Sequence, residues 1–587
     1  MNIIWSISFR NLIRQKRRNI LLGTAIAFGT AILIVANAFS HGISEVLFNR
    51  VMKYVSGHIA VGFYERGDYM RQIMRDGDWM LELVRREVPG ITGLQEAIGI
   101  FARALGNGKA DNVIMVGIDL DADTTKEGLE EAMANFPMAE GSFENLRDTA
   151  AGKNPVLIAQ SKAAYLNLKM GDVLRVRYRN VLGQNQTAML NIVGIVKPVN
   201  VFMSMPVYMN IHNLKKLAGY GPHDIGQLYI IMKNPKKNAI RYADRLHSLL
   251  TPSTAVIGAD FQSKAGSIRG AVAGFRSDSA GRVAVLNRLS FVSADTGSAF
   301  FKNGVLLSDS LAARLSLSPG DTLKFHFTTK YGGDTVAAAY RVTGTAGGDL
   351  SAKPIALLSD NEFYRWYYNH TPARDNDAAS LLPDSTSPIT EALAPTWFLM
   401  ERSRTSKDMM KRFRQIAGRK YKGLIVDVST MYESASMILQ VESALNIITF
   451  TAVMVLFFII LIGVVNTLRM TIRERTREIG TVRAIGMQAR DVRNSFLIEA
   501  GMLAFFSALA GTALAFAVMW ALSSITFKTD GNPLAMLLVN GRVFFAPTPQ
   551  AVAGFIALII AIAVVTAWFP ARRAARLSAA AALRHYE

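Results

Sequence analysis

The stretch that decides the fold is IITFTAVMVLFFIILIGVVNTL, residues 447–468, which contains no charged residue. A helix needs about 20 mainly apolar residues to cross the hydrocarbon core of a bilayer, so this stretch predicts a membrane span. Similar stretches are Ile20–Ser40, Phe496–Ser523 and Ala551–Phe569. The sequence therefore predicts a membrane protein with four transmembrane α-helices, at 19–41, 441–468 (a stalk and the second span), 496–523 and 551–571.

The distribution of basic residues orients these spans. The formal net charge is +20, and arginines gather before the first span, between the second and third, and after the fourth. Basic residues near span ends mark the cytoplasmic side. We therefore expect residues 1–18 (an amphipathic helix), the loop 469–495 and the tail 572–587 to be cytoplasmic. The region 42–440, of mixed and strand-rich composition, and the short loop 524–550 then lie on the other side, and 42–440 forms a large α+β domain.

The sequence contains few signs of chemistry. There is no cysteine, which excludes disulfides, thiolate metal sites and a cysteine nucleophile. The G-x-x-x-x-G-K-[ST], H-E-x-x-H and G-x-S-x-G patterns do not occur, and the eight histidines are scattered. We expect no catalytic residue, no metal site and no cofactor on this chain, and no nucleic-acid binding, because no aromatic platform accompanies the basic residues.

An internal repeat organises the large domain. VLIAQSKAAYLNLKMGDVL at 156–174 matches VLLSDSLAARLSLSPGDTL at 305–323, and each copy predicts a strand, a short helix, a Gly-Asp turn and an alternating strand. We predict a duplicated module, at about 150–245 and 300–375, that serves as a scaffold or a binding surface. Thr371–Thr396, rich in Pro, Ser and Asp, predicts an extended loop or linker, and Met431–Glu442 predicts a helical stalk.

Two membrane-side features remain. RMTIRERTREIGTVRAIGMQARDVRNS, residues 469–495, predicts two short amphipathic helices broken near Gly480 and Gly486, or else a plain basic connector. The third span contains Glu499, within reach of headgroups or of a loop arginine, or else part of a proton relay. The third span also contains small residues that predict close helix packing, namely Ala504, Ala508, Gly511 and Ala515.

The stretch TREIGTVRAIGMQARDV, between VVNTLRM and FLIEAG, resembles the signature of ABC transporter permeases of the FtsX/MacB/LolC-LolE class. The opening ISFRNLIRQKRRN, the stretch SGHIAV and the closing PARRAARLSAAAALR are also similar to that class. The resemblance implies a coupling helix that docks on a cytoplasmic ABC ATPase dimer, which would bind ATP and Mg²⁺. By this resemblance the ATPase-coupling residues are Arg477, Glu478, Ile479, Gly480, Arg483, Ala484, Ile485 and Gly486.

The resemblance to LolC/LolE-type subunits further implies a function. Such a permease, multi-pass in the bacterial inner membrane with its large domain in the periplasm, would extract lipoproteins from the outer leaflet for a periplasmic carrier. It would pair with a second permease copy or a paralogue. The acyl chains would enter a substrate cleft between the first two spans, for which we expect Val35, Phe39, Phe450 and Met454. The alternatives are MacB-like export by mechanotransmission, FtsX-like signalling to periplasmic cell-wall hydrolases, and a membrane-anchored enzyme.

Overall fold

The computed structural model describes residues 8, 10, 12–14, 16–46, 56–67, 69–120, 137–147, 154–198, 204–276, 291–292, 304–383, 389–402, 409–418, 422–434, 436–527, 538–539 and 541–576. The chain forms two compact units. One contains Met1–Val51, Val199–Val201 and Met437–Glu587, and the other contains Met52–Pro198 and Phe202–Ser436. Most of the predicted N-terminal amphipathic helix and the tail beyond residue 576 lie outside the described residues.

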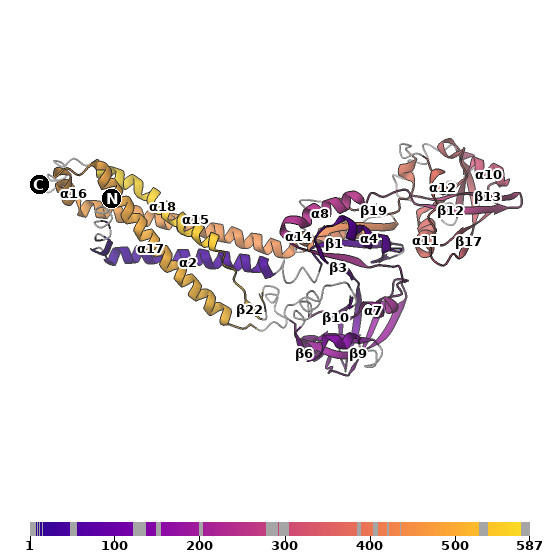
Figure 1. Cartoon of the computed structure of the whole chain (residues 1–587), viewed down its shortest axis with the longest axis horizontal. Helices are drawn as coiled ribbons and strands as arrows, with labels where there is room; N and C mark the ends of the chain where they lie inside the picture. The colour runs from indigo at the N-terminus through magenta and orange to yellow at the C-terminus, as the bar shows by residue number, and fades with distance from the viewer. Residues whose placement is uncertain are drawn as a thin grey trace. The chain divides into compact units, whose positions relative to one another are not determined.

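Long helices build the first unit (Figure 1). They are α2 (Lys16–Val46), α15 (Ser436–Glu474), α17 (Ala489–Ser524) and α18 (Pro549–Ala575). Three helical segments of the described chain are long and apolar enough to cross a membrane, namely Asn19–Ile43, α17 and α18. The second predicted span lies in α15, where the shorter apolar segment Asn446–Val455 is found. The count of four spans therefore stays a prediction.

Small residues bring α2 and α17 together, as the sequence predicts. Ala504, Ala508 and Ala515 of α17 are buried, and a Cβ added at Gly511 would lie 2.3 Å from the Ala27 carbonyl oxygen of α2. Backbones can approach this closely only where side chains are absent or small. The pair of helices is thus packed tightly along its length.

A central sheet organises the second unit. Its strand order is β19 (Phe398–Leu399), β20 (Gly423–Thr430), β1 (Ile59–Arg66), β11 (Gln227–Met232) and β3 (Ile91–Ala97), with β2 (Met70–Arg71) paired to β1. Helices α4 (Asp78–Glu87) and α8 (Pro235–Leu249) contribute Met80, Val84, Ala239, Ala243 and Leu246 to the same core as β1 and β11. After β20 the chain enters the short helix α14 (Met431–Ser434).

Two seven-stranded sheets are formed by segments inserted between strands of the central sheet, the first between β3 and β11 and the second between β11 and β19. We call them, with their helices, module 1 (99–218) and module 2 (256–370). Module 1 has the order β6 (Met138–Gly141), β9 (Asn185–Val196), β7 (Pro155–Ala159), β10 (Pro206–Asn210), β5 (Ala110–Ile118), β4 (Gly99–Leu105) and β8 (Val173–Arg179). Module 2 has the order β14 (Phe291–Val292), β17 (Thr335–Ala346), β15 (Gly304–Ser308), β18 (Ile355–Ser359), β13 (Gly266–Phe275), β12 (Val256–Ser263) and β16 (Thr322–Thr328). The two orders correspond strand for strand. Each sheet also has one additional pairing, between β8 and β9 in module 1 and between β16 and β17 in module 2.

The predicted elements of the repeat are present in both modules. Helix α6 (Gln160–Leu166) matches α10 (Asp309–Leu315), and each ends on a residue in the left-handed region, Asn167 or Ser316. The predicted Gly-Asp turns are also formed, with Gly171 at φ +90° and Gly320 at φ +104°. Helices α7 (Ile211–Ala218) and α11 (Asp360–His370) follow the matching strands β10 and β18. A common origin of the two modules by duplication stays a prediction.

The module boundaries differ from those predicted. The sheet of module 1 begins at Gly99, well before residue 150, and β11 and α8, which the range 150–245 includes, belong to the central sheet. Module 2 likewise begins at Val256 rather than near residue 300. The sequence match marks only the strand–helix–turn–strand segment, because β4, β5, β12 and β13 complete the sheets without a recognisable shared motif.

The prediction of a linker at Thr371–Thr396 is wrong. Residues 371–383 and 389–394, which we call the strap, contain α12 (Asn376–Ser380) and pack on module 2. Ala378, Leu382, Ile389, Ala392 and Leu393 are buried against Ala271 and Ala273 of β13. Asp375 caps α12 by accepting a hydrogen bond from the Ala378 N–H. The Pro, Ser and Asp content suggested a loop, but the interspersed Ala and Leu have an apolar surface on which to pack.

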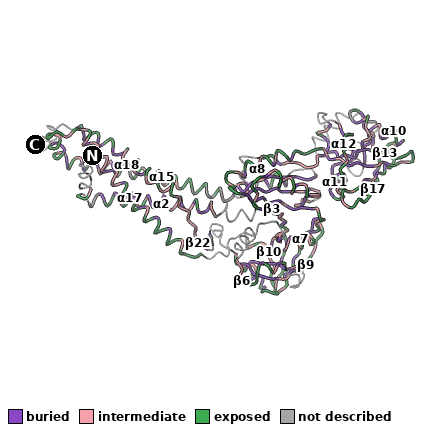
Figure 2. The backbone as a smooth tube through the Cα atoms, viewed as in Figure 1, coloured by how far each residue is buried: buried purple, intermediate pink, exposed green. Residues whose placement is uncertain are grey.

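The modules differ in their connection to the central sheet. The inner face of module 2 shares one continuous hydrophobic core with it, whereas module 1 has separate cores of its own. The strands of both modules are rich in buried positions (Figure 2). An ion pair joins module 1 to the central sheet, since Lys215 Nζ of α7 lies 2.7 Å from Glu96 Oε2 of β3.

Candidate functional site

The predicted coupling loop forms one short helix, α16 (Thr476–Ala484). It begins after Arg475, one residue beyond the end of α15, and the chain then turns at Gly486, whose φ of +111° favours glycine. The break predicted near Gly486 is confirmed, but the break predicted near Gly480 is wrong. Gly480 lies inside α16 and is buried, so burial of this helix face outweighs the roughly 1 kcal/mol that glycine costs in a helix interior.

The two faces of α16 divide the predicted coupling residues. Ile479 and Gly480 are buried, and Ile479 packs with Val492 and Phe496 of α17. Arg483 is half-buried. The exposed residues are Arg477, Glu478, Ala484, Ile485 and Gly486. A partner can therefore contact the second set, whereas the buried pair can only support the helix.

Two apolar side chains at the C-terminal end of α16 are exposed, and we call the side of the helix that carries them its outward face. Ile485 is 87% exposed, and Val482, three residues earlier, is 42% exposed. Residues three apart lie on the same helix face, so the two form one apolar patch next to charged neighbours. The sequence reasoning missed Val482, although its spacing from Ile485 was a usable signal. The coupling role of all these residues stays a prediction.

Ion pairs connect α16 with its neighbours. Arg475 Nη1 lies 3.9 Å from Glu499 Oε2 of α17, and both side chains are about nine-tenths buried. Glu499 thus reaches a loop arginine, one of the two positions that the sequence allowed for it. On the exposed side, Arg14 Nη1 lies 3.4 Å from Glu478 Oε1. A displacement of α16 would therefore be transmitted to α17 through a buried contact.

The four predicted cleft residues lie on two helices. Val35 and Phe39 are half-buried on α2, where Phe39 packs on Phe545 with ring centroids 6.0 Å apart. Phe450 and Met454 are exposed on α15. The two helices meet at Ser40 Oγ and Asn446 Oδ1, which are 3.0 Å apart, and again where a Cβ on Gly463 would lie 2.6 Å from Leu22. A cleft formed by these residues stays a prediction.

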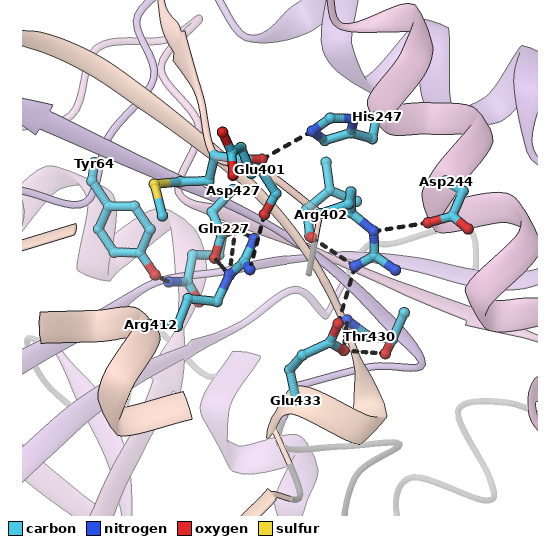
Figure 3. Close-up of polar contacts among 12 residues, drawn as sticks. Tyr64, Gln227, Asp244, His247, Glu401, Arg402, Arg412, Asp427, Thr430 and Glu433 are labelled. Carbon is cyan, nitrogen blue, oxygen red and sulfur yellow. Dashed lines mark hydrogen bonds and ion pairs between the residues drawn. The ribbon is translucent and has the colours of Figure 1, made fainter. Parts of the chain in front are cut away.

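A buried polar network surrounds the end of β20 (Figure 3). Arg402 donates to Asp244 Oδ1 of α8 at 3.0 Å and to Glu433 Oε1 of α14 at 3.2 Å. Glu433 Oε2 in turn accepts from the Thr430 N–H at 2.8 Å. Because removing one partner of a buried ion pair costs about 3–5 kcal/mol, this network fixes the point where the chain leaves the central sheet. This network could not be predicted from the sequence, since Asp244, Arg402 and Glu433 are far apart in the chain.

A second ion pair reinforces the same strand. Arg412 Nε donates to both carboxylate oxygens of Asp427, at 2.8 and 2.9 Å, and both side chains are buried. Burial and the nearby Asp427 carboxylate raise the pKa of Tyr64, so this hydroxyl stays neutral. In the described part of the chain no group of three or more His, Asp or Glu is arranged to hold a metal ion.

Two family models match the chain. The FtsX-like permease C-terminal model matches residues 450–579, which include α16, and the MacB-like periplasmic core domain model matches residues 21–248, which include module 1. Together they span both units. The chain is an ABC transporter permease of the FtsX/MacB class. Module 2 lies between the two matched regions of this permease.

Curated relatives agree with the class. The pyoverdine export ATP-binding/permease protein PvdT of Pseudomonas syringae pv. tomato is 40% identical over 122 residues, 21% of the permease and 16% of PvdT. The macrolide export ATP-binding/permease protein MacB of Pectobacterium atrosepticum is 34% identical over 116 residues, 20% of the permease and 16% of MacB. The permease thus spans about 16% of the length of these relatives.

The fold comparison is weaker. The periplasmic region of MacB from Actinobacillus actinomycetemcomitans is 12% identical, covers 35% of the permease and 87% of that chain, and has a TM-score of 0.23. A likeness at that level adds nothing to the assignment. The class assignment rests on the two family models. They describe a membrane permease with a large MacB-like periplasmic domain of mixed α/β fold. Permeases of this class work with a cytoplasmic ATPase.

Proposed function

We propose that this permease subunit extracts lipoproteins from the outer leaflet of the bacterial inner membrane, for delivery to the outer membrane through a periplasmic carrier. A separate ATPase dimer, which binds ATP and Mg²⁺, drives the process by docking on the outward face of α16. A second permease copy or a paralogue completes the transporter. LolC/LolE-type subunits, which the coupling-loop motif also resembles, have this activity.

The observation that supports this proposal is the apolar surface of α15. Phe450, Met454, Val455, Phe458, Ile459 and Ile462 are exposed on it, between 41% and 66%, and exposed positions are frequent along this helix (Figure 2). The sequence from Ile447 to Leu468 carries no charge. Such a surface suits acyl chains that stay in the hydrocarbon layer, and it offers no polar lining for a hydrophilic solute.

Export of a small molecule is the second candidate. The two relatives quoted above are export proteins by name, and they match this chain over 122 and 116 residues. In this alternative the two units transmit force from the ATPase to a periplasmic partner. Signalling to cell-wall hydrolases, as in FtsX-like proteins, is a third candidate within the same class.

Identification of the co-purifying molecules tests the proposal. The permease is purified with its ATPase, in the ATP-free state, and bound material is identified by mass spectrometry. Triacylated lipoproteins at a fixed stoichiometry are expected, and their loss after ATP addition would support extraction. Recovery of an outer-membrane channel or of a cell-wall hydrolase in place of lipoproteins would contradict it and favour one of the alternatives.

A substitution on α16 tests the coupling role separately. Ile485→Glu introduces a charge at the exposed apolar residue that directly follows α16. We expect it to lower transport-coupled ATPase activity at least about tenfold, because a desolvated apolar contact is lost. Leu182→Glu is the control, since Leu182 is also an exposed apolar residue, at 55%, but lies in module 1. Coupled activity within twofold of wild type in Ile485→Glu would contradict the coupling assignment.

A further inference from the structure

The outer face of module 1 has an unusual row of arginines. Arg103 of β4 lies directly opposite Arg177 of β8 in the strand register, and Arg175 and Arg179 share the same face of β8. All four side chains belong to exposed residues, and within the described residues none of the four forms an ion pair. Like charges directly opposite each other in a sheet are destabilising. The fold therefore retains an unfavourable contact at this position.

The matching position in module 2 is internally neutralised. There Asp260 of β12 lies opposite His326 of β16 and Arg269 of β13. Asp260 Oδ2 accepts from Arg269 Nη1 at 2.9 Å and lies 3.8 Å from His326 Nε2. The matching position thus carries an ion-paired aspartate in module 2, Asp260, and an arginine in module 1, Arg103. The sheet itself does not require the charge repulsion.

Exposed apolar side chains accompany the arginines. Phe101 is 79% exposed, Met189 60% and Leu105 45%, and in the register Leu105 lies opposite Arg175, which lies opposite Met189. In module 2 the positions matching Leu105 and Met189 are Gln262 and Ala339, and the position matching Phe101 is Gly258. Gly258 is covered by Asp375 of the strap. Module 1 therefore combines arginines that form no ion pair in the described residues with exposed apolar side chains, whereas module 2 has an ion-paired aspartate and no large apolar side chain at the matching positions.

We infer that this face of module 1, formed by β4, β8 and the first half of β9, docks an acidic protein. The carboxylates of the partner would pair with Arg103, Arg175 and Arg177, whose planar guanidinium groups bind carboxylates in bidentate fashion. The apolar side chains would fill the spaces between these pairs. The inference goes beyond the proposed function, because it holds whichever substrate the permease moves.

The composition of the face favours a protein over the other possible occupants. Arg, Phe and Met are enriched in protein interfaces and Lys is depleted, and the exposed positions named here include no lysine. A second copy of the chain would have to present the same surface in a two-fold contact, and none of the residues that pair across β5, β4, β8 and β9 at Arg103 or Leu105 is acidic. The positive surface would also accelerate encounter with an acidic partner.

Binding of a defined acidic probe tests the inference. The permease with its ATPase is placed in nanodiscs of uncharged phosphatidylcholine, and a fluorescent peptide of alternating Glu and Leu is titrated by anisotropy. We expect binding that weakens with salt and falls at least about tenfold in Arg103→Glu/Arg177→Glu, because two attractions become repulsions. The control is Lys324→Glu/His326→Glu, the matching face of module 2, which should stay within twofold of wild type. Absence of peptide binding, or equal affinity in both variants, would overturn the inference.

Photo-cross-linking in cells distinguishes the occupants. A benzoylphenylalanine replaces Phe101, which is already an exposed aromatic residue, and Gln262 on module 2 is the control position. An adduct with an acidic periplasmic protein that disappears in Arg103→Glu/Arg177→Glu supports the inference. An adduct with a second copy of the permease or with phospholipid, or no adduct, overturns it. Neither measurement depends on lipoprotein extraction, so this inference and the proposed function can fail independently.

Discussion

Matching positions on the outer faces of module 1 and module 2 carry very different residues. Phe101 stands 79% exposed on β4, while its counterpart on β12 is Gly258, buried beneath the strap. Arg103 opposes Arg177, while Asp260 opposes His326. The inner faces are by contrast alike, since β8 and β16 both alternate exposed and buried residues around an apolar core. Two sheets of the same topology can therefore have similar inner faces, which pack against an apolar core, and very different outer faces.

The strap accounts for most of this difference. It supplies the apolar cover that module 2 needs, and the residues beneath it are small, such as Gly258, Ala271 and Ala273. Module 2 also shares its inner core with the central sheet. The strap thus covers the outer face of module 2 at β12 and β13, whereas the matching face of module 1 on β4 is exposed in the part of the chain that the structure describes. This contrast favours module 1 as the contact surface and module 2 as a rigid part of the scaffold.

Exchanging the matching residues should give the largest effect. In Gly258→Phe a Cβ alone would lie 2.1 Å from Asp375 Oδ2, so the ring must displace the strap, at an expected cost of about 3 kcal/mol in unfolding free energy. Hydrogen exchange of the strap amides in the purified permease measures this effect. The reciprocal control, Phe101→Gly, should cost about 1 kcal/mol or less, because it removes an exposed side chain and adds only the strand penalty of glycine. Equal protection of the strap in Gly258→Phe and wild type would contradict the assigned packing.

The comparison of the two modules also shows which features could be predicted from the sequence and which could not. The apolar spans, the helix that contains the coupling motif, the repeat elements, the tight packing at Ala504–Gly511 and the contact of Glu499 with a loop arginine could all be predicted, because each depends on local pattern. The strap could not, since its burial depends on a surface made by β12 and β13 more than 90 residues away. The network of Arg402, Asp244 and Glu433 and the opposed pair Arg103 and Arg177 were likewise unpredictable. Both depend on which strands become neighbours, and the sequence does not state that register.

Acid should release the strap from module 2. The hydrogen bond from the Ala378 N–H, helped by Arg269, holds the pKa of Asp375 below its usual value. A carboxylate with a lowered folded pKa stabilises the fold above its unfolded pKa, about 3.9, and this stabilisation is lost as the pH falls through the lower folded pKa. We expect the protection factors of the strap amides, which correct for the intrinsic pH dependence of amide exchange, to fall below about pH 4, while those at β4 and β8 change less.

A neutral variant provides the control for this prediction. Asp375→Asn retains a weaker cap but loses the ion pair with Arg269, and it should raise strap exchange at neutral pH by an amount corresponding to about 1 kcal/mol. The protection factors of its strap amides should then depend little on pH in the acid range. A variant that kept the acid dependence of wild type would show that another group is responsible.

Changing the opposed charges tests the second part of the comparison. Arg103→Asp places a carboxylate opposite Arg177, as in module 2, and should stabilise module 1 by about 0.5–1 kcal/mol while it weakens the acidic-peptide binding described above. Asp260→Arg introduces the module 1 pattern into module 2 and should destabilise it by a similar amount. Hydrogen exchange at β4 and at β12 measures the two changes. If Arg103→Asp destabilised β4, the two arginines would have a favourable structural role that the register does not reveal.

The smallest expected effect concerns the ends of α6 and α10, which are otherwise alike. Both helices end on a non-glycine residue in the left-handed region, with φ of +53° at Asn167 and +51° at Ser316. Asparagine tolerates this conformation better than serine does. Ser316→Gly should therefore stabilise module 2 by about 0.5 kcal/mol, after allowance for the greater freedom of glycine in the unfolded chain. Asn167→Gly should change module 1 by no more than a few tenths of a kcal/mol. Exchange at the amides of α10 and α6 measures both, and a larger gain in Asn167→Gly than in Ser316→Gly would contradict the prediction, because it would show that the Asn167 side chain strains the turn that it ends.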